Sequence, residues 1–112
     1  MRWVLPLLVL AACSKEPEAD LPSIGEARSI VAEWALVNEQ AAQGRVNATY
    51  VQSMRKQLRE QLRTTATSLK QPDSIYASEI QACLKLSDDA LPAELRAHSQ
   101  RLKQIEDSLE SA

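Results

Sequence analysis

The sequence predicts an all-α protein, a small antiparallel up-and-down bundle of three to four helices. Only two of the 112 residues are glycine and none is phenylalanine, whereas β-sheet proteins need turn glycines and many β-branched or aromatic residues. Ala, Leu, Gln, Glu, Lys and Arg dominate instead, and these residues have the highest helix propensities. Apolar residues recur at steps of three and four along the chain, which is the spacing of one helix face. Brief turns between the helical segments favour antiparallel neighbours.

The first predicted helix covers residues 23–43. Ser23 and Glu26 form a capping-box pattern, in which a serine caps the helix and a glutamate three residues later bonds back to it. Gly44 ends the helix, because glycine readily adopts the left-handed conformation that follows a helix end. The predicted apolar face consists of Ala27, Ile30, Val31, Trp34, Val37 and Ala41.

Caps and prolines delimit the second and third predicted helices. Asn47 caps the second helix, and Pro72 ends it because proline cannot continue a helix. The triplet that begins at Asn47 also matches a glycosylation acceptor, and we favour the capping role. The third, shorter helix follows a cap at either Asp73 or Ser74. The predicted apolar faces consist of Tyr50, Val51, Met54, Leu58, Leu62, Thr65 and Leu69 in the second helix and of Ile75, Tyr76, Ile80, Cys83 and Leu84 in the third.

The fourth predicted helix follows a loop over residues 87–90 and has Pro92 in its first turn, a position that suits proline. Its apolar residues alternate steps of four and three, which is a heptad seam. The seam lasts for under three heptads, so we favour packing inside the bundle over binding of a partner helix or of a second copy. The seam consists of Leu91, Leu95, His98, Leu102, Ile105 and Leu109.

The chain begins with the three-part layout of an export signal. Arg2 supplies a positive charge, an apolar stretch covers residues 3–10, and two alanines follow it. The stretch is far shorter than the roughly 20 residues that a membrane-spanning helix needs. We therefore expect residues 1–12 to be a cleaved signal peptide and not a transmembrane anchor.

The tetrapeptide Leu10-Ala11-Ala12-Cys13 resembles the lipobox of bacterial lipoproteins. The resemblance implies that the sulfur of Cys13 accepts a diacylglycerol, that a peptidase cuts just before this cysteine, and that the freed amine is acylated as well. Each acyl CH₂ in a bilayer contributes about 0.8 kcal/mol, so two or three chains hold a small domain firmly. The match is confined to residues 1–14, and beyond it the chain resembles small lipoproteins of Gram-negative bacteria without carrying a further family motif.

These observations divide the chain into a signal peptide (1–12), a lipidated Cys13 with a flexible tether (13–22) and a helical bundle domain (23–112). The tether is polar and contains two prolines, as expected of an extended spacer. Ser14 follows the cysteine. In enterobacterial lipoproteins an aspartate at that position retains the protein at the inner membrane. The resemblance therefore implies an outer-membrane lipoprotein that faces the periplasm.

Charge and cysteine content argue against several classes of function. Removal of the signal takes away Arg2 and changes the formal net charge from −2 to −3, which is not the balance of a nucleic-acid-binding protein. Cys13 and Cys83 are the two cysteines, so an acylated Cys13 leaves no internal disulfide. The single histidine, one remaining thiol and scattered carboxylates do not supply four metal ligands at short spacing. We therefore expect neither a metal site nor a cofactor.

Cys83 and His98 are the candidate nucleophile and base, because both occupy predicted inward faces. No Cys–His family signature surrounds either residue, so we do not expect an enzyme. We favour a buried thiol that packs as a small hydrophobe and a seam histidine with its nitrogens near the bundle edge. The remaining alternative is a redox role, in which an exposed Cys83 links two chains in an oxidising periplasm.

A basic row gives the best candidate for a binding surface. Arg55, Arg59 and Arg63 repeat every four residues along the second predicted helix. Such a row could contact lipid head groups, lipopolysaccharide phosphates or an acidic partner. The alternative, which we favour, is a solvated face paired in part with acidic residues of neighbouring helices.

The sequence thus predicts a membrane-anchored periplasmic lipoprotein without catalytic activity, whose helical domain interacts with a protein partner in the envelope. The alternative is a carrier of a small apolar ligand or lipid, with Trp34, Tyr50 and Tyr76 lining a pocket between helices. An apolar cavity of several hundred Å³ would favour the carrier, and a solid core would favour the contact protein.

Overall fold

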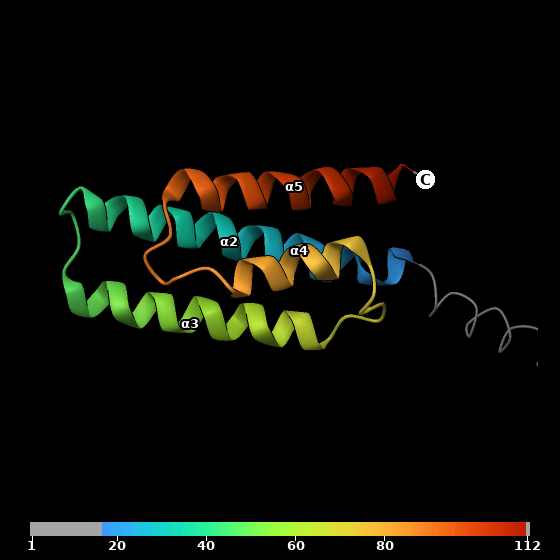
Figure 1. Cartoon of the computed structure of the whole chain (residues 1–112), viewed down its shortest axis with the longest axis horizontal. Coiled ribbons are helices and arrows are strands. Elements are labelled where there is room, and N and C mark those ends of the chain that lie inside the picture. Colours follow the sequence, from blue (N-terminus) through green and yellow to red (C-terminus); the bar gives the residue numbers. More distant parts are fainter. Residues whose placement is uncertain (1–16, 112) are drawn as a thin grey trace, which may run out of the picture.

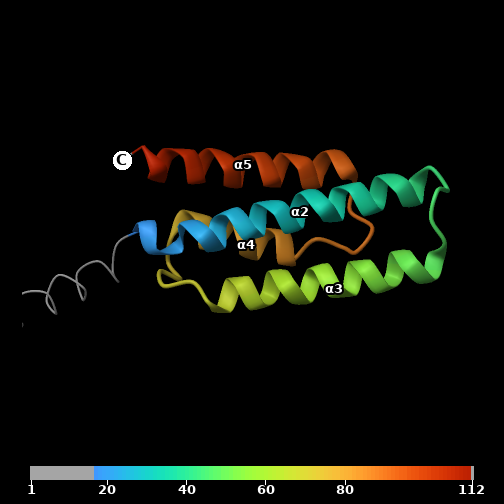
Figure 2. The ribbon, with the colours of Figure 1, turned by 180° about the vertical axis from the view of Figure 1, so that it is seen from behind.

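A computed structural model describes residues 17–111, which form a four-helix bundle preceded by one short 3₁₀ helix. Consecutive helices run in opposite directions (Figures 1 and 2), and the described residues include no strand. The predicted all-α, antiparallel up-and-down bundle is therefore confirmed. The elements are η1 (Pro17–Asp20), α2 (Leu21–Ala42), α3 (Ala48–Thr67), α4 (Ile75–Leu84) and α5 (Pro92–Glu110).

Helix α2 is the central element, because it packs along both α5 and α3, while the short α4 contacts α3 and α5 at one end of the bundle (Figure 1). Trp34 of α2 is completely buried and is the largest side chain of the core. Four-residue and three-residue steps along each helix bring the apolar side chains to this common interior. The fully buried large aliphatic side chains are Ile24, Val31, Leu58, Leu62, Ile80, Leu95 and Leu102.

The folded unit begins earlier than the predicted boundary at Ser23. Helix α2 starts at Leu21, with a proline in its first turn, and η1 precedes it. Asp20 is 1% exposed, so the segment next to α2 packs against the bundle and is not an extended tether. The predicted capping box is also wrong, because the carboxylate of Glu26 accepts a 2.6 Å hydrogen bond from the Thr65 hydroxyl of α3. The predicted signal, Cys13 and the first part of the tether lie outside the described residues.

Three helix boundaries agree with the sequence patterns. The side chain of Asn47 caps α3 by accepting a 2.8 Å hydrogen bond from the backbone N–H of Tyr50. Of the two cap candidates for α4, Ser74 takes the role, with its hydroxyl accepting from the N–H of Ala77. Gly44 has φ +68°, the left-handed conformation expected just beyond α2.

Three apolar residues predicted to face inward are exposed: Tyr50 is 44% exposed, Ile75 73% and Leu91 69%. Each lies at the beginning of its helix, in the first turn or at the cap position. Periodicity assigns a residue to a helix face, but it does not tell whether a neighbouring helix extends far enough to cover that end. The inward prediction for these three residues is therefore wrong.

The α4–α5 connection crosses the part of the bundle that the short α4 leaves uncovered, and polar side chains of α2 hold it there. The indole N–H of Trp34 donates to the backbone oxygen of Asp88 at 3.0 Å. The amide of Asn38 donates to the backbone oxygens of Asp88 and Ala90 at 3.1 and 2.8 Å. Buried carbonyl groups need such partners, so these bonds fix where α5 begins.

Candidate functional site

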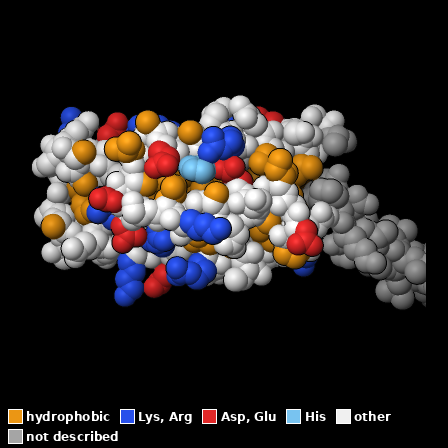
Figure 3. Space-filling model, in the orientation of Figure 1, with side chains coloured by type: hydrophobic (Ala, Val, Ile, Leu, Met, Phe, Trp, Pro, Cys, Tyr) orange, Lys and Arg blue, Asp and Glu red, His pale blue; other side chains and the backbone are white. Residues whose placement is uncertain are grey.

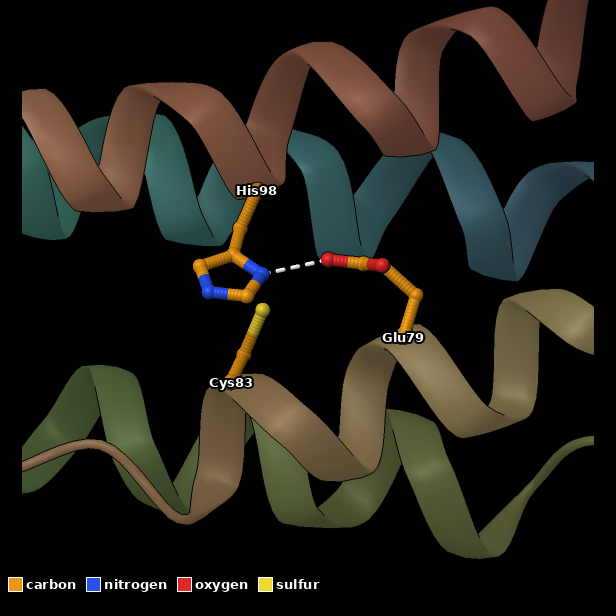
Figure 4. A group of neighbouring side chains, drawn as sticks. All are labelled: Glu79, Cys83 and His98. Atoms are coloured by element: carbon orange, nitrogen blue, oxygen red, sulfur yellow. Dashed lines mark hydrogen bonds and ion pairs between the residues drawn. The ribbon is translucent and has the colours of Figure 1, made fainter.

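The main candidate site lies between α4 and α5 and consists of Glu79, Cys83 and His98 (Figure 4). Glu79 and Cys83 are four residues apart on α4, which places both side chains on one face of the helix. His98 extends toward them from α5. One oxygen, one sulfur and one ring nitrogen of these residues all lie within 4.8 Å of one another. Helix packing therefore brings together three different donor atoms.

Arg101 is the cation that lies next to this cluster. An oxygen of Glu79 is in direct contact with Nδ1 of His98, and Nε of Arg101 lies 3.2 Å from both Glu79 oxygens. Nη2 of Arg101 lies 2.9 Å from the same histidine nitrogen. The Arg101 side chain is 49% exposed, whereas those of Glu79 and His98 are 15% and 13% exposed. A guanidinium at the surface thus faces a largely buried carboxylate.

The thiol of Cys83 lies inside this cluster and is 0% exposed. Burial raises the pKa of the thiol to about 12, and the negative charge of Glu79 adds to this shift while Arg101 opposes it. The thiol is consequently protonated at neutral pH. A cysteine nucleophile needs the opposite, a lowered pKa and access for a substrate. The geometry therefore supplies a histidine and a carboxylate next to the thiol without activating it.

The structure joins the two residues that the sequence singled out, Cys83 and His98, and adds a third that sequence reasoning missed. Glu79 lies four positions before Cys83, a spacing that places both side chains on the same helix face. This spacing is the sequence signal that could have identified Glu79. The expectation that no metal site exists was based on ligand spacing along the chain. Spacing does not detect donors that two helices contribute, and the structure places three such donors together.

The arginine row is not a continuous free surface. Arg59 donates 2.7 Å hydrogen bonds from its two terminal nitrogens to the backbone oxygens of Leu84 and Leu86. Its Nε lies 3.3 Å from a carboxylate oxygen of Asp88, and its guanidinium stacks 5.2 Å from the ring centre of Trp34. Arg59 therefore caps the last carbonyls of α4, where a cation is favourable.

The other two members of the row differ from each other. Arg55 donates a 2.8 Å hydrogen bond to the side-chain oxygen of Asn38, so it supports the residue that holds the α4–α5 connection. Arg63 is exposed, and among residues 17–111 no hydrogen bond or ion pair is found for it. Because two of the three arginines serve the fold, the predicted anion-binding row is reduced to Arg63 and neighbouring exposed cations such as Lys56.

An apolar groove adjoins the cluster. It has a volume of about 400 Å³, is open to solvent and is lined by Ile75, Glu79, Arg101, Gln104, Ile105, Ser108 and Leu109. Figure 3 shows hydrophobic side chains at the surface near the single histidine on this face, among charged groups of both signs. A second open groove, of about 540 Å³ between α2 and α3, is lined mostly by polar side chains. The groove between α4 and α5 is thus the more apolar of the two, and Glu79 belongs both to this groove and to the candidate site.

No family model matches this chain, and no similar curated protein or solved structure was found. Among the described residues, no helix combines the length and the apolar character needed to cross a bilayer. A functional proposal for this protein therefore depends on its own residues.

Proposed function

We propose that the protein is a lipid-anchored lipoprotein of the outer membrane that faces the periplasm, and that its helical bundle acts by contact with a protein partner in the envelope. The bundle is a non-catalytic interaction domain in this proposal. The observation that carries it is the lipobox-like tetrapeptide that ends at Cys13, preceded by a positive charge and an apolar stretch.

The position of the bundle ends indicates how a tethered domain would be oriented. The start of α2, the end of α5 and the α3–α4 connection lie at the same end of the bundle (Figure 1). The α2–α3 connection lies at the opposite end, and Gly44 belongs to this connection. Anchoring through Cys13 would therefore place the α4–α5 groove nearer the membrane and the Gly44 turn farther from it, because α4 occupies the half of the bundle next to the start of α2.

The α4–α5 groove is the surface best suited to a protein contact. Ile75 is 73% exposed, and Ile105 and Leu109 of α5 are only partly buried. The carboxylate of Glu79 and the guanidinium of Arg101 form its polar border. An apolar centre with a charged rim is the usual composition of an interface core and its surroundings.

The anchor is tested by replacing the acyl acceptor. A Cys13→Ala variant should lose labelled palmitate and leave the membrane fraction, whereas a Cys83→Ala variant should keep both. If Cys13→Ala remains with the membranes and palmitate never labels the wild-type protein, the lipoprotein proposal is wrong.

The contact surface is tested separately by photocrosslinking in cells. A photoreactive residue at position 75 should crosslink to a discrete partner, because this position borders the groove. The same residue at position 57, on the exposed side of α3, serves as the control. Equal crosslinking from both positions, or none from position 75, would contradict the groove as the contact surface.

A second function, carriage of a small apolar ligand, is favoured by the same groove, whose volume of about 400 Å³ and three aliphatic side chains, Ile75, Ile105 and Leu109, suit an acyl chain. The three aromatic residues predicted to line the pocket do not line this groove, because Trp34 and Tyr76 are buried in the core and Tyr50 is exposed at the start of α3. A fluorescent fatty acid should bind the carrier, and Ile105→Gln should weaken that binding. Absence of saturable binding would exclude the carrier and leave the contact protein.

A further inference from the structure

The donor set between α4 and α5 matches the chemistry of a transition-metal ion. Zinc in proteins is bound by cysteine sulfur at about 2.3 Å, by histidine nitrogen at about 2.0–2.1 Å and by carboxylate oxygen at about 2.0–2.2 Å. These bond lengths require tetrahedral donors to lie roughly 3.5 Å apart. The three donors of Glu79, Cys83 and His98 already lie within 4.8 Å of one another.

The side chains approach the required position from suitable directions. Glu79 and Cys83 point away from α4 toward the histidine ring, and Nδ1 of His98 faces the carboxylate (Figure 4). An ion between these groups needs the carboxylate and the ring nitrogen to move slightly apart. Glu79 lines the open groove, so a change of its side-chain rotamer would make this room.

The charges also fit a divalent ion. Arg101 supplies the positive charge that faces Glu79, and its half-exposed guanidinium can turn outward to water. On metal binding the S–H bond of Cys83 breaks, its proton leaves to solvent and a zinc–sulfur bond forms, without any change of oxidation state. One thiolate and one carboxylate then neutralise the two charges of the ion.

We propose that Glu79, Cys83 and His98 form a binding site for Zn²⁺, with a fourth coordination position left to water or to a donor atom of a ligand in the adjoining groove. A mixed sulfur, nitrogen and oxygen set selects zinc over the hard cations Mg²⁺ and Ca²⁺, which prefer oxygen ligands. Three protein ligands with an open position are typical of sites that exchange or bind a further ligand, while structural zinc sites use four protein ligands. The site goes beyond the proposed interaction domain and does not depend on the lipid anchor.

The test uses the full chain with Cys13→Ser, so that Cys83 is the only thiol. Zn²⁺ is titrated alone by calorimetry, and Cd²⁺ is titrated as a spectroscopic substitute whose sulfur-to-metal absorption reports thiolate coordination. We expect one ion per chain, the sulfur–cadmium band and release of a proton. Absence of the band, or a stoichiometry that Mg²⁺ reproduces, would overturn the proposal.

Variants distinguish the site from adventitious surface binding. Cys83→Ser, His98→Gln and Glu79→Gln should each weaken zinc binding by at least about 10-fold, since even loss of an outer partner of a metal ligand costs that much. Glu110→Gln, at the exposed end of α5, is the matched carboxylate control and should leave affinity unchanged. Unchanged affinity in all three ligand variants would refute the site.

Arg101→Gln separates coordination from general electrostatics. This change removes the guanidinium that competes for Glu79, so zinc affinity should rise several-fold in this variant but not in the combined variant with Cys83→Ser. Circular dichroism confirms that each variant folds. If a ligand variant does not fold, the sulfur–cadmium band of the parent chain and the Arg101→Gln titration still decide the question.

Discussion

The hydroxyl of Tyr76 donates a 2.6 Å hydrogen bond to the carboxylate of Asp20, across 56 positions of sequence. Both side chains are buried, and the same carboxylate accepts from the backbone N–H groups of Lys70 and Gln71 at 2.8 and 3.1 Å. One carboxylate therefore joins the start of α2 to the α3–α4 connection and to α4. This arrangement holds the first turn of α4, the helix that carries Glu79 and Cys83, next to the start of α2.

Asp20→Ala should destabilise the fold by about 2–4 kcal/mol, because it leaves two N–H groups and one hydroxyl without their acceptor. Urea denaturation monitored by circular dichroism measures the change. Asp73→Ala is the control, since Asp73 is an exposed carboxylate in the same connection and its removal should cost less than about 0.5 kcal/mol. Equal stabilities of the two variants would contradict the structural role of Asp20.

The same contact predicts an alkaline dependence of stability. Burial, together with the hydrogen bond to Asp20, raises the pKa of Tyr76 to about 12. Below a pH of about 10 both the folded and the unfolded chain keep the proton, so this contribution is complete. Between pH 10 and 12, roughly, only the folded chain keeps it, so stability falls as pH rises.

Between pH 10 and 12, roughly, the free energy of unfolding should fall more steeply with pH in the wild-type chain than in Tyr76→Phe. Urea unfolding of both proteins measures the two slopes. The raised pKa of Cys83 acts in the same direction, and it contributes equally to both proteins, so the difference isolates Tyr76.

Tyr50→Phe provides a direct readout, because Tyr76 is then the one remaining tyrosine and its ultraviolet tyrosinate band reports its ionisation. A tyrosinate band that develops at a pH of about 10 or lower in folded Tyr50→Phe would refute the shift.

Arg59→Ala should lower stability by about 2–3 kcal/mol, since the Leu84 and Leu86 carbonyls lose charged donors and Trp34 loses its stacked guanidinium. Arg63→Ala is the matched control one turn away, and we expect a change within about 0.5 kcal/mol. Chemical denaturation measures both variants. A similar loss in both would mean that the row acts as one surface and that Arg59 has no special role.

Cys83 should react slowly with a thiol reagent in the native protein. The side chain is 0% exposed and its pKa is raised to about 12, so at neutral pH both access and the thiolate fraction are low. In a Cys13→Ser chain at a pH of about 8, we expect labelling at least about 100-fold slower than in urea. Equal rates in native and unfolded protein, or a disulfide-linked dimer in oxidising buffer, would contradict the buried position.

Much of the helical scaffold could be predicted from local patterns. The cap at Asn47 and the left-handed Gly44 are properties of a few neighbouring residues, and both appear in the structure as expected. For α4 the sequence offered two cap residues, Asp73 and Ser74, and the structure shows Ser74 in this role. The buried face of α2 follows from the 3.6-residue period in the same way. Such features depend on short-range geometry, which the sequence displays directly.

Long-range polar contacts could not be predicted in this way. The sequence pattern assigns Asp20 to a polar spacer and Arg59 to a solvated row. Asp20 is instead an acceptor for groups about fifty positions away, and Arg59 is a donor to the end of α4. A polar side chain alone does not reveal which buried backbone group it will meet.

By itself, the sequence determined the helical class and the approximate helices, because both depend on residues close together along the chain. The same kind of local pattern is the source of the proposal that Cys13 is acylated. Only the tertiary structure decided that Glu79, Cys83 and His98 meet, and that two of the three arginines serve the fold. The physical reason is helix packing. Side chains of different helices meet only when the helices pack in a particular register. That register depends on the whole core, so no local pattern encodes it.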